Sequence, residues 1–354
     1  MALDTVQLDQ VAVGHASTVA AVVSAIRRGS GAHAYLLVGP SGVGKAAVAR
    51  QVAAVLMCPT AKGPCGTCSH CLQLAGGLHP DVIWLQRELD EHSGLRRRQY
   101  GLDAVRDFIV RLSRTSGSGR QVAVIPEAEA LGEGSANALL KTLEEPAPGV
   151  VFLLLAKNPQ LLPSTVVSRC QVVRLHPLPV TRLSQQLVEF GIPPAEAQAV
   201  ARLSGGLPAT AWQLALDPQE RRQRRETLQQ FLQVWSAPLA QRLVRVAELS
   251  QAAQAADDER SVAARVDDWL AQYSVVVRDL LLVRLGLRAL VRHTGDLDEL
   301  DRAVAGCPPQ ALAAFAEQVQ ASRGYLAGNA NVRLVLENLF LTAVPALSGR
   351  PTSV

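Results

Sequence analysis

Four cysteines within fourteen residues carry the most specific chemistry in this sequence. They are spaced C-x6-C-x2-C-x2-C, and turn-forming glycines and prolines lie among them: Cys58, Cys65, Cys68 and Cys71. Thiolates at this spacing can converge on one tetrahedral ion, and four of them leave no open ligand position. Free core thiols or a redox pair are the alternatives, but clustering of this kind favours metal. The spacing therefore predicts a structural zinc ion.

A glycine-rich turn follows a short apolar segment, residues 34–38, and runs into a helical pattern. A strand, a G-x-x-x-x-G-K turn and a helix start are the context of a phosphate-binding loop, where backbone N–H groups, the helix terminus and the lysine attract an anion. The alternative is a loop that only turns the chain, and the sequence leaves open whether ATP or ADP binds. The candidate nucleotide-binding residues are Gly39, Pro40, Ser41, Gly42, Val43, Gly44, Lys45 and Ala46.

Two magnesium ligands of a hydrolysing phosphate-loop enzyme are missing. The residue after the lysine is normally Ser or Thr, whose hydroxyl holds Mg²⁺, but here it is Ala46. In such an enzyme the strand that corresponds to residues 121–125 ends in an Asp that organises the metal, but here Pro126 follows the strand. The sequence therefore predicts that this chain does not hydrolyse ATP by itself.

A third group of polar residues follows the apolar run 150–156. Asn158 comes where this predicted strand opens into a loop, and Ser168 and Arg169 lie on the next surface loop. Ligands of α/β sheets bind at the carboxyl ends of parallel strands. An arginine on the neighbouring loop is placed to act on a site outside its own domain, so a subunit that works on its neighbour is expected.

These residues require an α/β domain to position them. Strands are predicted at 34–38, 82–85, 121–125, 150–156 and 172–175, after a lead-in strand and a helix in residues 1–33. From residue 217 on the pattern is almost wholly helical, including one long helix over 261–291. The predicted domains are 1–176 (with the cysteine module at 58–71), 177–217 and 218–354.

Composition limits the class of protein. Hydrophobic residues make up 48% and charged residues 19%, as in a folded globular protein. No apolar run reaches the roughly 18 residues that span a bilayer, and the first residues lack the pattern of a signal peptide, so a cytoplasmic protein without a membrane partner is expected. The net charge of +4 is smaller than that of dedicated DNA-binding domains.

With these motifs in place, the chain resembles the δ′ family of bacterial DNA polymerase III clamp-loader subunits, AAA+ proteins related to γ/τ. The resemblance rests on residues 33–45, the four-cysteine insert, residues 79–82, SANALLKTLEEP at 135–146 and STVVSRC at 164–170. NANVRL, from Asn329 to Leu334, resembles a helix start in the family's C-terminal domain.

The resemblance implies an architecture and roles. It implies an N-terminal RecA-like AAA+ domain with a parallel sheet and a zinc module, a small helical lid and an all-α collar that oligomerises. Arg169 of the Ser168-Arg169 pair would reach in trans into the ATP site of an adjacent γ/τ subunit, and Asn158 occupies the sensor-1 position. The implied partners are the γ/τ and δ subunits and, through the complex, the sliding clamp and primer–template DNA.

Departures from the family's active members decide between the alternatives. An active γ-like ATPase would have Ser or Thr at Ala46, Asp at Pro126 and an arginine near Pro208, and this chain has none of them. That ATPase is the second interpretation. A stand-alone zinc-dependent nucleic-acid-binding protein is a third, but aromatic residues make up only 4% and form no stacking platform.

Overall fold

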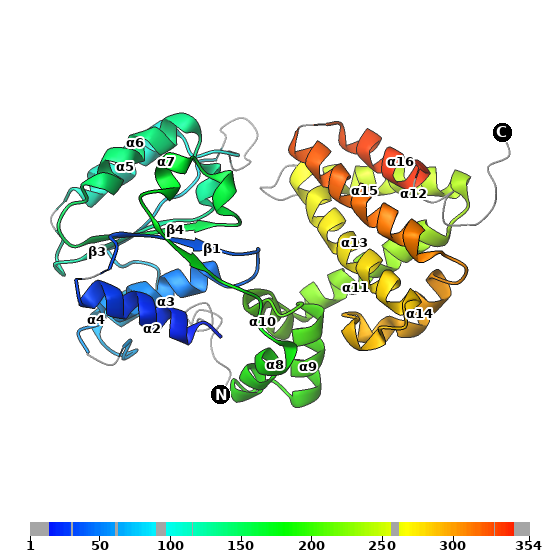
Figure 1. Ribbon diagram of the computed structural model, residues 1–354, viewed down its shortest axis with the longest axis horizontal. Helices are drawn as coiled ribbons and strands as arrows, with labels where there is room; N and C mark the ends of the chain where they lie inside the picture. The colour runs from blue at the N-terminus through cyan, green and yellow to red at the C-terminus, as the bar shows by residue number, and fades with distance from the viewer. Residues whose placement is uncertain are drawn as a thin grey trace. The chain divides into compact units, whose positions relative to one another are not determined.

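The computed structural model describes residues 14–29, 31–60, 63–89, 97–114, 116–255, 262–328 and 330–342 (Figure 1). The predicted lead-in strand before residue 14 and Asn329 of the NANVRL motif lie outside these residues. The chain divides into two compact units, Met1–Leu216 and Asp217–Val354. The three predicted domains remain a prediction, since this division has two units.

The first unit is built on a five-stranded, wholly parallel sheet. Its strands lie in the order β2-β3-β4-β1-β5, which confirms the predicted parallel sheet: β1 (Ala34–Val38), β2 (Val82–Trp84), β3 (Gln121–Ile125), β4 (Val150–Ala156) and β5 (Gln171–Arg174). Because β1 and β4 are neighbours, the loops that leave their carboxyl ends start side by side. The Gly39 N–H donates to the Ala156 C=O across this edge at 3.1 Å.

Helices cover both faces of this sheet, so β1, β3 and β4 are buried along their whole length. One layer holds α2 (Ala16–Arg27), α3 (Lys45–Met57) and α4 (Ser69–Ala75), and the other holds α5 (Leu102–Leu112), α6 (Glu133–Glu144) and α7 (Ser164–Val167) (Figure 1). Successive side chains of β1 alternate between them. Leu36 packs in the α5–α6 core, and Tyr35 and Leu37 pack in the α2–α3 core. Short 3₁₀ turns follow β3 (Ala128–Ala130) and β4 (Pro159–Leu161).

A bundle of three helices completes the first unit. It comprises α8 (Val180–Glu189), α9 (Pro194–Leu203) and α10 (Pro208–Leu216), and a proline begins α9 and α10. Proline suits the first turn because that N–H has no partner within the helix. Leu183, Leu187 and Val200 form a core with Trp212, separate from the cores of the sheet.

The described secondary-structure elements of the second unit are all helices. Its α-helices are α11 (Pro218–Ser236), α12 (Leu239–Ala255), α13 (Val262–Arg284), α14 (Leu297–Ala303), α15 (Pro309–Ala327) and α16 (Val332–Thr342). They contribute to a core that contains the aromatic side chains of Phe231, Tyr273, Phe315 and Phe340. None of the described helices in either unit is long and apolar enough to span a bilayer.

The long helix predicted over residues 261–291 is wrong at its C-terminal end. Helix α13 stops at Arg284, and Gly286 has a φ of +74° that continues no helix. Separate 3₁₀ turns follow at Arg288–Leu290 and Thr294–Asp296. The apolar residues after Gly286 imitate helical spacing, so the pattern alone placed them in the helix.

Candidate functional site

The glycine loop (residues 39–46) connects the end of β1 to the start of α3. Gly42 and Gly44 have φ values of +80° and +98°, which only glycine adopts readily. Gly44 is the N-cap of α3 and offers no side chain to the helix. In the described part of the chain, no group accepts from the N–H groups of Lys45 and Ala46. The loop thus presents free backbone donors at a helix N-terminus, as anion binding requires.

The Lys45 ammonium group is held over this loop by the loop's own carbonyls. Its Nζ donates to the Gly39 C=O at 2.6 Å and to the Pro40 C=O at 3.0 Å. One of its three N–H bonds remains for another acceptor. Burial lowers the pKa of Lys45; Lys157 adds to this, and Glu129 and Glu127 oppose it. An anion beside the loop would counter this desolvation.

Ala46 and Pro126, which stand where magnesium ligands would be, make other contacts in the structure. The Ala46 methyl group packs against the α2–α3 core. The Pro126 C=O accepts a hydrogen bond from the Tyr100 hydroxyl. Glu127, the next residue, has a φ of +47° and forms an ion pair with Arg87. Sequence reasoning missed Arg87 and Tyr100, because both come from the segment between β2 and α5, far away along the chain.

His15 is a further residue that the sequence did not single out. Its imidazole is 6% exposed, and Nε2 lies 2.9 Å from the Val43 C=O, so Nε2 carries the proton. Burial lowers the pKa of His15; the hydrogen bond to the Val43 C=O opposes this shift, and the nearby Arg182 and His176 add to it. A neutral His15 therefore supports the glycine loop from the N-terminal end of α2.

Asn158 lies two residues beyond the end of β4, beside the strand that leads into the glycine loop. Its side chain caps the following 3₁₀ turn: Oδ1 accepts from the Gln160 N–H at 3.1 Å. Asn158 is exposed. The sheet brings its segment to the same edge as the glycine loop, but its hydrogen bonds are local.

Arg169 follows α7 and is fixed by two neighbouring helices. Its Nε donates to Glu144 Oε1 at 2.8 Å, its Nη2 donates to the same oxygen, and its Nη1 donates to the Thr165 C=O at 2.7 Å. The side chain remains 31% exposed. The Ser168 hydroxyl donates to the Thr165 C=O at 3.2 Å. These partners belong to α6 and α7, not to the glycine loop, so Arg169 is not placed for the loop of its own chain.

The four predicted metal ligands are brought together. The Sγ atoms of Cys58, Cys65, Cys68 and Cys71 lie within 4.8 Å of one another. Ligands about 2.3 Å from a tetrahedral zinc ion are about 3.8 Å apart, and Cys65 Sγ to Cys71 Sγ measures 4.0 Å. The Cys68 N–H donates to Cys65 Sγ, and the Cys71 N–H donates to Cys68 Sγ. N–H donors favour thiolates, and those from Thr67 and Cys68 lower the pKa of Cys65 to about 6, whereas burial raises that of Cys71 to about 12. The donor set fits a metal ion.

The cysteine module is tied to the sheet by a chain of polar groups. His70 Nδ1 lies 2.9 Å from His79 Nε2, and His79 Nδ1 accepts the Asp81 N–H. The Asp81 carboxylate accepts the Ser118 hydroxyl at 2.7 Å. Because Nδ1 of His79 is an acceptor, Nε2 carries its proton and donates to His70. The cysteine spacing did not predict this link, because His79 follows α4 and lies eight residues beyond Cys71.

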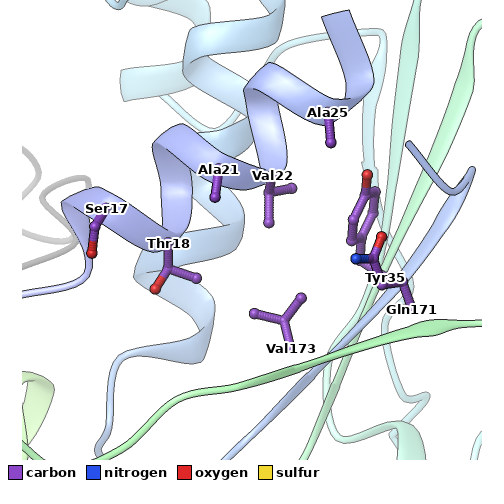
Figure 2. Close-up of a pocket in the computed structure, with 8 residues that line it drawn as sticks. All are labelled: Ser17, Thr18, Ala21, Val22, Ala25, Tyr35, Gln171 and Val173. Carbon is purple, nitrogen blue, oxygen red and sulfur yellow. The ribbon is translucent and has the colours of Figure 1, made fainter. Parts of the chain in front are cut away.

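A separate pocket of about 330 Å³ lies between α2 and the edge strand β5 (Figure 2). It is lined by Ser17, Thr18, Ala21, Val22, Ala25, Tyr35, Gln171 and Val173. The buried Tyr35 hydroxyl has no hydrogen-bond partner in the described part of the chain. The pocket shares no residue with the glycine loop, so it is not part of that site.

The sheet and its loops define the class of protein. A parallel sheet with β1 inside it, a glycine loop between β1 and α3, and a three-helix bundle after β5 make up the predicted RecA-like AAA+ domain. The predicted fold class, with its cysteine module and helical C-terminal unit, is confirmed. The roles predicted for Asn158, Ser168, Arg169 and residues 39–46 stay predictions.

Comparison with known proteins then identifies the relatives of this chain. Residues 14–179 match the family "DNA polymerase III, delta subunit". The chain is 42% identical to DNA polymerase III subunit δ′ of Pseudomonas aeruginosa over 193 residues and 34% identical to that of Escherichia coli over 224 residues. These matches cover 53% and 61% of this chain. They confirm the resemblance to the δ′ family.

The similarity extends to τ subunits and does not span whole relatives. Over 178 residues the chain is 37% identical to DNA polymerase III subunit τ of Escherichia coli, which is 49% of this chain and 26% of τ. The matches with δ′ span 57% of the Pseudomonas protein and 64% of the Escherichia coli protein. The chain thus matches somewhat more than half the length of these δ′ relatives.

Proposed function

We propose that this chain is a non-hydrolysing, δ′-type subunit of the DNA polymerase III clamp loader. Its nearest partners would be γ/τ and δ subunits, and the assembled loader would open a sliding clamp and place it on primer–template DNA. The identity to δ′ relatives supports this assignment. The family match over residues 14–179 agrees with it.

Three features, one in the glycine loop and two just after β3, support the absence of hydrolysis. Ala46 has no hydroxyl for Mg²⁺, and Pro126 has no carboxylate. Glu127, the carboxylate at the end of β3, is bound by the Arg87 guanidinium. An oxygen of Glu127 is already engaged by this guanidinium, so the carboxylate is not free to position a water molecule. ATP or ADP could still bind through the free N–H groups and Lys45, without reaction.

The observation that carries the proposal is that the Arg169 side chain is held by hydrogen bonds and yet remains partly exposed. A guanidinium has five N–H donors, and the three close hydrogen bonds to Glu144 and Thr165 leave others for a partner outside the chain. The side chain is partly exposed and held in one orientation. Such an arginine would stabilise charge on the phosphoryl group in the ATP site of the adjacent γ/τ subunit.

A structural zinc ion at the four cysteines completes the proposal. Held by Cys58, Cys65, Cys68 and Cys71, the ion would cross-link the turn-rich insert to α3. It would not act in catalysis, since four thiolates fill its coordination shell.

ATP turnover by the purified chain, alone and with γ/τ and δ subunits, tests the proposal. We expect no turnover alone and DNA-stimulated turnover in the complex. The Arg169→Ala complex should lose about 10³-fold or more at the site that the arginine faces. Unchanged turnover in that complex, shown to assemble normally, would refute the role of Arg169. Turnover by the isolated chain that disappears with Lys45→Ala would instead support an active γ-like ATPase.

A further inference from the structure

The pocket between α2 and β5 is an open site at the edge of the described sheet, with a volume of about 330 Å³ (Figure 2). One wall is a single face of α2 from Ser17 to Ala25, which spans about 12 Å along the helix. The other wall is β5, through Gln171 and Val173. Because Ser17 and Gln171 are exposed, the pocket is open to solvent along its rim. A cavity of this size admits a small molecule.

The inner side of the pocket contains a buried polar group without a partner. Tyr35 on β1 is 1% exposed, and its hydroxyl forms no hydrogen bond with any described residue of the chain. Burial raises the pKa of Tyr35, so the hydroxyl keeps its proton and can donate it in a hydrogen bond. A buried hydroxyl without a hydrogen bond costs free energy, which an acceptor that enters the pocket would recover.

Gln171 is the second donor at this end of the pocket. Tyr35 and Gln171 are register partners in the parallel pairing of β1 and β5, and their side chains lie at the same end of the pocket (Figure 2). The Gln171 amide also forms no hydrogen bond with the residues that the structure describes. Because the Gln171 side chain is exposed, it can turn aside and let the oxygen of a ligand reach the Tyr35 hydroxyl. Both groups can then donate to that one oxygen.

The remainder of the lining selects against a charged ligand. Ala21, Val22 and Val173 form the apolar middle of the pocket (Figure 2). None of the eight lining residues is charged, and Arg27 and Arg28, at the end of α2, are hydrogen-bonded to other groups. A carboxylate buried here would lose its hydration without gaining a cation, which is costly. The pocket therefore favours an uncharged ligand.

We propose that the pocket between α2 and β5 binds a small, uncharged molecule that has a carbonyl oxygen and an apolar body, such as a primary amide. The Tyr35 hydroxyl and the Gln171 amide donate to the carbonyl oxygen, and the apolar body lies along Val22 and Val173. Burial of this body and the new hydrogen bonds favour binding. The pocket contains neither Arg169 nor any residue of the glycine loop, so this inference does not rest on the proposed function.

Titration of the full chain with hexanamide, followed by saturation-transfer NMR, tests the site. We expect saturable binding with a Kd on the order of 1 mM, as a probe of this size allows. Hexanoate has a similar shape but a negative charge, and it should bind about tenfold more weakly or worse. Tyr35→Phe removes the hydroxyl, retains the ring and should weaken hexanamide binding about fivefold. Tyr325→Phe, at an exposed tyrosine of the second unit, is the matched control and should bind as the wild type does.

A pair of substitutions on α2 tests the place of binding. Ala21→Leu puts a larger side chain into the pocket and should abolish hexanamide binding. Ala20→Leu adds the same side chain at an exposed position outside the lining and should leave binding unchanged. Circular dichroism and equal thermal midpoints show that both variants are folded.

Four results would overturn the proposal. They are no binding of hexanamide, equal binding of hexanoate, equal binding by the two leucine variants, and wild-type affinity in Tyr35→Phe. The last two comparisons are independent, so the test remains decisive if one variant fails to fold. Because the chain is measured alone and without nucleotide, the result is separate from the turnover assay of the complex.

Discussion

Arg169 and Glu144 form an ion pair in which two nitrogens of one guanidinium bind a single carboxylate oxygen. Glu144 ends α6, and Arg169 follows α7, so the pair joins two helices at the surface. The Thr165 C=O holds a third nitrogen of the same group at 2.7 Å. An arginine on a surface loop would otherwise sample many rotamers, and this arrangement limits it to one.

The pair predicts that Glu144 orients Arg169 for its role in trans. In the assembled complex, Glu144→Ala should lower Arg169-dependent ATP turnover on the order of tenfold, because a mobile arginine spends less time in the productive position. Glu144→Gln retains an acceptor oxygen and should lower it less. Both carry a stability change of about 1 kcal/mol or less, since the pair is partly exposed. Higher turnover with Glu144→Ala would mean that Glu144 restrains Arg169 instead.

The cysteine cluster predicts about one zinc ion per chain. Cys65→Ser should lose the metal and lower the free energy of unfolding of the first unit by about 3 kcal/mol, because metal binding stabilises only the folded insert. The thermal midpoint should fall by roughly 6 °C or more. Cys307→Ser, outside the cluster, is the control and should keep its zinc. Metal analysis that finds no zinc, with all four thiols reactive, would contradict the prediction.

The buried imidazole of His15 predicts a loss of stability in acid. Its folded-state pKa lies below the ordinary value of 6.5, so the unfolded chain takes up the proton first as the pH falls. The stabilisation by neutral His15 is therefore complete above about pH 6.5 and declines below it. His15→Gln retains an N–H donor for the Val43 C=O but does not titrate. Urea denaturation from pH 8 to pH 5 should show the wild type losing more stability than this variant; equal slopes would contradict the prediction.

We predict that the stability of the second unit depends strongly on the buried carboxylate of Asp279. It is 0% exposed and accepts the N–H groups of Arg292 and His293 at 2.9 and 3.0 Å and the His293 Nδ1–H at 2.8 Å. Asp279→Ala leaves these donors without an acceptor and should cost about 3 kcal/mol or more.

Asp267 offers the matched control, because its pair with Arg323 is partly exposed. Asp267→Ala should cost about 1 kcal/mol or less. Urea denaturation followed by circular dichroism measures both variants. Equal losses of stability would show that burial does not strengthen the role of Asp279.

Local patterns in the sequence predicted much of the fold. The strands of the sheet are apolar runs between turns, and the glycine loop and the cysteine cluster are contiguous motifs, so each could be found from neighbouring residues. The end of α13 was missed because Leu287, Leu290 and Val291 keep helical spacing, although Leu287 and Leu290 are exposed and Val291 is buried. Spacing shows which residues are apolar, but neither whether they are buried nor which element holds them.

The sequence by itself determined the parallel α/β domain, the four thiols placed to hold a metal and the loss of two magnesium ligands. Only the tertiary structure decided the partners of the functional candidates: Glu144 for Arg169, Arg87 for Glu127, and Ala209 for Gly42. The physical reason is that these contacts join residues 25, 40 and about 170 positions apart. Periodicity and motif spacing reflect backbone geometry within one element, whereas such contacts depend on how the helices and loops pack around the sheet.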